Sequence, residues 1–168
     1  AEAVWLLHQP LAQELDRCGM EQLYKEIELP LCRVLYKMER RGIAIDREQL
    51  AAFGKMLSGH IADCEALIYS YSGASFNINS PKQLGEVLFD QLGLPPVKKT
   101  KTGYATNADV LEKLKNKHPI IPAIVDYRML TKLKSTYADG LMKEIREDGR
   151  IHTTLQNLVT ATGRLSST

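Results

Sequence analysis

The sequence has little of what marks disulfide-rich, zinc-binding or membrane proteins. Its three cysteines, Cys18, Cys32 and Cys64, are odd in number and far apart, and they form no CxxC pair. This argues against a disulfide framework and a zinc site. No apolar run approaches the roughly 18 residues that a bilayer span requires. The N-terminus lacks the basic start and apolar core of a secretory signal. We therefore predict a cytoplasmic protein without a membrane partner.

Recognisable catalytic motifs are also missing. There is no glycine-rich phosphate loop and no nucleophile elbow, and the four histidines lack the spacing of a metal site. The acidic residues are scattered, mostly on predicted helix faces. Two-metal phosphoryl transfer needs acidic ligands that hold both ions. We therefore predict no catalytic residues, no metal site and no cofactor within this chain.

Positive charge is concentrated in one stretch. Residues 97–137 hold 9 Lys/Arg against 3 Asp/Glu, whereas residues 1–96 hold 9 against 13. A local excess of this kind in a protein of net charge +2 indicates a surface for a polyanion. A solvated lysine-rich helix surface would give the same count, so charge alone leaves both interpretations open.

Two long helices dominate the expected fold. Asp46 and Gln49 form a capping box, and apolar residues then recur every three or four positions from Leu50 to Tyr71. This predicts a helix of about 25 residues. A second long helix is expected from Ile120 to about Glu147.

The second long helix carries a polar row. At about 100° per residue, Arg128, Lys132 and Ser135 fall on one face, and the apolar residues Leu130, Leu133, Tyr137 and Leu141 fall on the opposite one. Two cations and a hydroxyl in a row suit the phosphates of a nucleic-acid backbone. Asp126 is the only acid between Asn116 and Ala138, which favours nucleic-acid binding over an ordinary polar face.

Two further segments could bind phosphate. Asn77, Asn79 and Ser80 lead into a helix that starts with Pro81, and a helix N-terminus attracts anions; Ser80 is also expected to cap that helix. The loop from Lys98 to Gly103 holds three lysines and two threonines. Such a loop is equally typical of a phosphate clamp and of a surface tip.

The predicted fold class is therefore mainly α. Two long helices form an antiparallel hairpin, short helices lie at its tip, and a small β segment follows at residues 151–159 near the C-terminal end.

Several strings of the sequence resemble the thumb of bacterial family A DNA polymerases. The most specific are FNINSPKQL (76–84), KTKTGY (99–104), YRMLTKLKSTY (127–137) and TATGRLSS (160–167). In this family the thumb grips the primer–template duplex through contacts that do not depend on base sequence.

The resemblance implies roles for individual residues. Asn77, Asn79 and Ser80 would contact the sugar–phosphate backbone near the minor groove. Lys99 and Lys101 would lie at the thumb tip, with Thr102 and Thr106 nearby. Arg128, Lys132 and Ser135 would line the duplex, and Arg164 would approach the minor groove near the primer terminus.

The resemblance also implies a division of the chain. Residues 1–27 would be the last helices of a 3′–5′ exonuclease-like domain, 28–147 the thumb, and 148–168 the start of the palm. The rest of the palm, with its metal-binding acids, and the fingers would lie beyond Thr168. The complete protein would be a DNA-directed DNA polymerase of replication and repair, associated with the nucleoid and using two Mg²⁺. This part alone would not polymerise, and its oligomeric state stays open.

Two other interpretations fit the composition. The chain could be a stand-alone helical module that binds nucleic acid without enzyme activity. It could also be a protein-interaction hairpin whose basic row meets an acidic partner.

Overall fold

The computed structural model describes residues 2–97, 99–100 and 103–168. The chain forms two compact units, the first made of Ala1–Ile45 and Ile145–Thr168 and the second of Asp46–Glu144. The chain therefore passes between the units twice, at 45/46 and at 144/145. The boundaries at 27/28 and 147/148 that the resemblance implies stay predictions.

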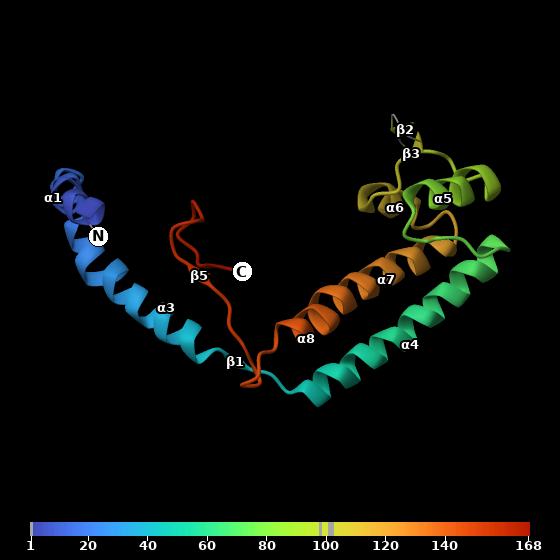
Figure 1. Cartoon of the computed structure of the whole chain (residues 1–168). Coiled ribbons are helices and arrows are strands. Elements are labelled where there is room, and N and C mark those ends of the chain that lie inside the picture. Colours follow the sequence, from blue (N-terminus) through green and yellow to red (C-terminus); the bar gives the residue numbers. More distant parts are fainter. Residues whose placement is uncertain (1, 98, 101–102) are drawn as a thin grey trace. The chain divides into compact units, whose positions relative to one another are not determined.

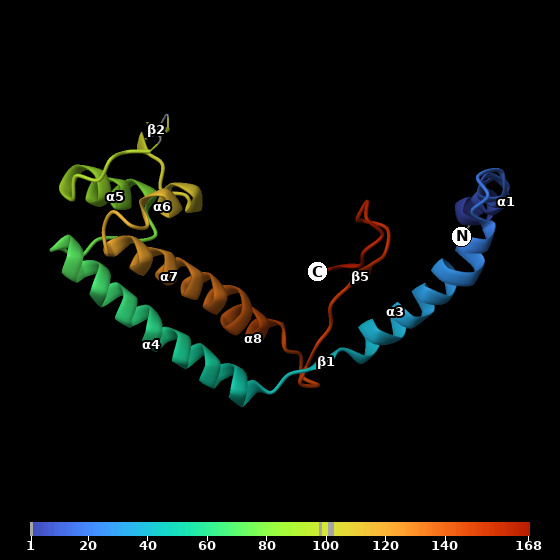
Figure 2. The ribbon, with the colours of Figure 1, turned by 180° about the vertical axis from the view of Figure 1, so that it is seen from behind.

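The second unit is built on an antiparallel helical hairpin (Figures 1 and 2). One arm is α4, Arg47–Ser72. The Asp46 carboxylate accepts hydrogen bonds of 3.0 Å from the backbone N–H groups of Glu48 and Gln49, which satisfies donors that a helix start leaves unpaired. The expected cap and length of this helix are confirmed. The other arm runs through α7 (Ile120–Leu133), the π-helical turn η3 (Lys134–Asp139) and α8 (Gly140–Glu144).

The second arm departs from the uniform helix that we expected to reach residue 147. A π turn bonds backbone groups five rather than four residues apart, which changes the face on which later residues lie. Gly140 suits this turn, because a Cβ there would lie 3.0 Å from the Ser135 carbonyl oxygen. Ala138 is buried and Tyr137 is 54% exposed, so the predicted apolar face is wrong for Tyr137.

The buried face of α7 is set mainly by its first half, where the tip helices α5 (Pro81–Gly85), η2 (Glu86–Gln91) and α6 (Ala108–Leu114) gather. Side chains less than 2% exposed fill the space between α4, α7 and the tip: Ile68, Leu84, Leu88, Leu111, Leu114, Ile120, Ile121 and Ile124. Full burial of each is worth about 1.5–3 kcal/mol. This core makes the tip a firm support for the loops on it.

A short hairpin rises from the tip, made of β2 (Lys99–Thr100) and β3 (Gly103–Tyr104), with Lys99 paired to Tyr104. The Tyr104 ring packs against Phe89, with ring centroids 4.7 Å apart. Its hydroxyl donates a 2.6 Å hydrogen bond to Asp90. These contacts fasten β3 to η2.

The first unit begins with α1 (Glu2–Arg17) and a second helical run made of α2 (Glu21–Leu23), η1 (Tyr24–Glu28) and α3 (Leu29–Arg41). Its strands are very short: β1 (Ile43–Ala44) pairs with β4 (Arg150–Ile151), and β5 (Leu155–Gln156) pairs with β6 (Ser166–Ser167), both antiparallel. The β segment predicted over 151–159 is thus divided between two separate ladders.

His152 joins α3 to the β1–β4 ladder. Its Nδ1 lies 2.7 Å from the Glu39 carbonyl oxygen, and its Nε2 lies 2.8 Å from an Asp148 carboxylate oxygen. Both neighbours are acceptors, so the doubly protonated ring satisfies both bonds. The hydrogen bonds to the Asp148 carboxylate and the Glu39 carbonyl raise the pKa of His152, against smaller opposing effects of burial and of the nearby Arg146 charge. The hydrogen bond from His152 lowers the pKa of Asp148.

These shifts predict how stability depends on pH. A raised histidine pKa stabilises the fold below the ordinary value of 6.5, and this contribution is lost as pH rises through the folded-state pKa. The lowered Asp148 pKa contributes above 3.8 and is lost as pH falls. We expect the urea midpoint of the first unit to be highest between about pH 4 and 6.5 and to fall as the pH rises through the folded-state pKa of His152. In His152→Ala the alkaline fall should disappear; an unchanged fall would assign it to another group.

The mainly α fold class is confirmed. Short strands complete a helical hairpin with small helices at its tip. Among the helices of the described residues, none has the length and apolarity to cross a bilayer.

Candidate nucleic-acid interface

The turn before α5 is closed by its own polar groups. The Asn77 side-chain oxygen accepts a 3.0 Å hydrogen bond from the Asn79 N–H, and the Ser80 hydroxyl accepts a 3.4 Å bond from the Gln83 N–H. The Gln83 side chain accepts a 2.7 Å bond from the Asn77 N–H. The capping role expected for Ser80 is confirmed. Asn77 and Asn79 are exposed and Ser80 is half-buried.

Asn79 reaches from this turn to α7. Its amide nitrogen donates a 3.0 Å hydrogen bond to the Tyr127 hydroxyl. Tyr127 is 5% exposed and belongs to the core. The turn is therefore anchored beside Arg128, the next residue of α7, although 48 positions separate the two partners in the chain.

Arg128 is tied to the other tip segment. Its guanidinium donates hydrogen bonds to the carbonyl and hydroxyl oxygens of Thr106, which is itself buried. Burial lowers the pKa of Arg128. Thr106 therefore lies beside the predicted polar row but supports Arg128 rather than offering an open hydroxyl.

Lys132 is exposed one turn further along α7. Ser135 is also exposed, and its hydroxyl donates a 3.2 Å bond to the Lys132 carbonyl oxygen. Ser135 lies inside η3, so its angle from Arg128 no longer follows the uniform helical turn.

The remaining candidates lie elsewhere. Lys101 and Thr102 fall outside the described residues. Lys99 belongs to β2 and pairs across the hairpin with the β3 residue Tyr104. Arg164 is an exposed residue of the first unit, whose carbonyl oxygen accepts a bond from the Thr160 hydroxyl.

The structure thus brings two separated segments, the Asn79 turn and the Thr106 segment, to one turn of a third, α7. The turn at Asn79 is tied to Tyr127, and the segment at Thr106, which follows the basic loop, is tied to Arg128. Lys132 extends this surface toward η3. Sequence reasoning identified Arg128 and Asn79 but missed Tyr127, because no local pattern reveals a contact 48 residues away.

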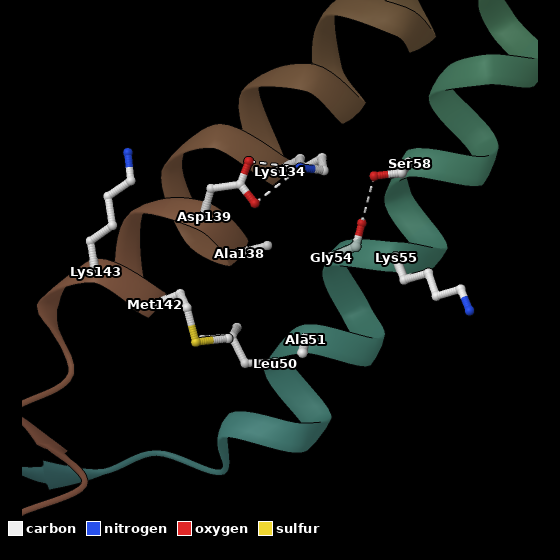
Figure 3. A pocket seen from close by; sticks show the side chains of 10 residues that line it. All are labelled: Leu50, Ala51, Gly54, Lys55, Ser58, Lys134, Ala138, Asp139, Met142 and Lys143. Carbon is white, nitrogen blue, oxygen red and sulfur yellow. Dashed lines mark hydrogen bonds and ion pairs between the residues drawn. The ribbon is translucent and has the colours of Figure 1, made fainter.

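A second basic feature lies lower on the hairpin, where a groove opens between α4 and the η3–α8 segment (Figure 3). Leu50, Ala138 and Met142 supply apolar lining. Lys134 is paired with Asp139 at 2.7 Å, while Lys55 and Lys143 lie on the two arms of the hairpin and are exposed. Sequence analysis did not single out these lysines.

The described residues contain no cluster of three or more His, Cys, Asp or Glu side chains that could hold a metal ion.

Comparison with known proteins gives a consistent result. The sequence model of a family described as "DNA polymerase family A" matches residues 47–168. DNA polymerase I of Bacillus subtilis is 47% identical, with the match covering 100% of this chain and 19% of that protein. DNA polymerase I of Geobacillus stearothermophilus is 49% identical, with 99% and 19% covered. The chain therefore spans about a fifth of the length of these curated relatives.

Among solved structures, the chain is similar to the POL domain of Pol1 from M. smegmatis in complex with DNA primer-template and dNTP. The two share 45% sequence identity at a TM-score of 0.84. The match covers 100% of this chain and 30% of that one.

Proposed function

Because the chain belongs to DNA polymerase family A, we propose that it is the part of a DNA polymerase I that grips the primer–template duplex. The observation that carries this proposal is that the Asn79 turn and the Thr106 segment are bonded to two consecutive residues of α7, Tyr127 and Arg128. The similar polymerase domain that is named with DNA primer-template supports the same ligand.

The chemistry of this surface suits backbone binding. Lys132 is a solvated cation that neutralises phosphate and releases counterions. Arg128 is partly desolvated, so it has less hydration to lose when a phosphate approaches. Asn79 presents an exposed carboxamide before α5, which can both donate to and accept from a sugar–phosphate backbone. None of these groups distinguishes one base pair from another, so the grip is insensitive to sequence.

The remaining assignments follow from family membership. Lys99, Lys101 and Thr102 would touch the duplex from the tip loop, and Arg164 would approach the minor groove near the primer terminus. Residues 1–27 would close an exonuclease-like domain, 28–147 would be the thumb, and 148–168 would enter the palm. The complete protein would be a bacterial, nucleoid-associated nucleotidyltransferase of DNA replication and repair that uses two Mg²⁺, whose ligands would lie in the palm.

Binding of a labelled primer–template to the 168-residue chain tests the proposal. Fluorescence anisotropy should show binding at low ionic strength, with log Kd rising linearly with log salt by about 0.9 per neutralised phosphate. Duplexes of unrelated sequence should bind within about twofold of one another. The chain alone should incorporate no nucleotide. Absence of binding at low salt, or affinity for one sequence only, would contradict the proposed grip.

A further inference from the structure

Tyr127 is a buried core residue whose side chain has one polar atom, the hydroxyl oxygen, and this oxygen contacts a residue of the candidate interface. The ring lies in the core between α7, α4 and the tip helices, while the hydroxyl is 3.0 Å from the Asn79 amide nitrogen. A buried tyrosine hydroxyl usually finds a hydrogen-bond partner. Here the partner is an exposed side chain of the turn proposed to meet DNA.

The two asparagines of this turn have different tasks. The Asn77 side-chain oxygen is occupied by the Asn79 N–H, which shapes the turn from within. The Asn79 carboxamide gives one hydrogen to Tyr127. An amide nitrogen carries two hydrogens, so the second hydrogen and the carbonyl oxygen are left for a ligand. Of the two asparagines, Asn79 has the side chain that α7 orients.

We propose that Tyr127 is a positioning residue for DNA binding: its hydroxyl holds the Asn79 carboxamide in the orientation that meets the sugar–phosphate backbone. This rests on the proposed function. The next residue, Arg128, holds Thr106, so two consecutive residues of α7 anchor both tip segments. An amide held in place loses less side-chain freedom on binding than a mobile one, which favours affinity.

A double-mutant cycle tests the pairing. Tyr127→Phe keeps the ring and removes only the acceptor, and we expect Kd for primer–template to rise about three- to tenfold, the scale of one neutral hydrogen bond. In an Asn79→Ala background the same change should alter Kd by less than about twofold, because no amide remains to be positioned. In the complete polymerase the loss should appear in KM for DNA rather than in kcat.

Tyr69→Phe is the matched control. Its hydroxyl donates a 3.0 Å bond to the Phe76 carbonyl oxygen, next to the same turn. Tyr69→Phe also removes one part-buried hydroxyl hydrogen bond, but that bond does not involve Asn79. Its effect on Kd should therefore be the same with Asn79 present and in the Asn79→Ala background.

Three results would overturn the inference. Tyr127→Phe could leave Kd unchanged, or it could raise Kd equally with and without Asn79, as a purely structural hydroxyl would. Asn79→Ala could also leave Kd unchanged, in which case there is no contact to position. The proposed function is decided separately by the salt and sequence dependence of the unmodified chain.

Discussion

Primer–template binding is expected to weaken by about two to four orders of magnitude at low ionic strength when Arg128 and Lys132 are both replaced by alanine. Each hydrogen bond to a charged group contributes about 1.5–3 kcal/mol, and about 1.4 kcal/mol corresponds to a factor of ten. The plot of log Kd against log salt should also become less steep by about 1.8, because two phosphates are no longer neutralised. Anisotropy titrations at four or five salt concentrations measure both effects, and the loss should be the same for unrelated duplex sequences.

The matched control removes two cations elsewhere in the same unit. Lys55→Ala with Lys143→Ala takes charge from the groove of Figure 3 and should change Kd by less than about threefold. Lys132→Ala alone separates charge from structure, because Arg128 also holds Thr106. Equal losses in the two double variants would mean that overall charge, not this face, governs binding.

Gly42→Ala is expected to destabilise the first unit by about 2–4 kcal/mol. Gly42 has φ 66° and ψ 179°, a region that only glycine adopts readily. A Cβ there would lie 2.8 Å from His152 Cε1 and 2.9 Å from the Ile151 carbonyl oxygen. The backbone at Gly42 and the ring that bonds to Glu39 therefore cannot both keep their places. Urea unfolding followed by circular dichroism measures the loss.

Gly149→Ala provides the comparison within the same unit. Its φ is also positive, at 74°, but a Cβ there would meet nothing within 4 Å. Only the backbone cost of about 1–2 kcal/mol should appear. If the two variants lose equal stability, contact with His152 is not what makes Gly42 necessary.

The sequence predicted best where the determinants are local. The Asp46 carboxylate caps α4 and the Ser80 hydroxyl caps α5, because each bond joins groups two or three residues apart. The face of the second arm was less predictable. A wheel of constant angle placed Tyr137 in the packed face, whereas the π turn η3 buries Ala138 instead. Whether a helix widens at one turn depends on packing against α4, which the order of residues does not state.

The candidate site shows the same division. Arg128 and Asn79 could be chosen from charge, helix geometry and family resemblance. The hydrogen-bond partners of these two residues could not be predicted, because the bonds from Asn79 to Tyr127 and from Arg128 to Thr106 join residues 48 and 22 positions apart. Thr106 was expected near the DNA, and its burial gives it a supporting part. Such partners are set by how the tip helices close over α7.

The β1–β4 ladder has a consequence for modularity. Ala44 pairs with Arg150, and the Ile45 N–H donates to the Gly149 carbonyl oxygen at 3.2 Å. The two segments by which the chain leaves and re-enters the first unit therefore lie side by side. Everything from Asp46 to Glu144 is thus a single insertion between neighbouring strands. An insertion whose two ends lie side by side can be lengthened, shortened or replaced without changing the path of the chain in the first unit. The length of the helical hairpin can therefore change in evolution independently of the first unit.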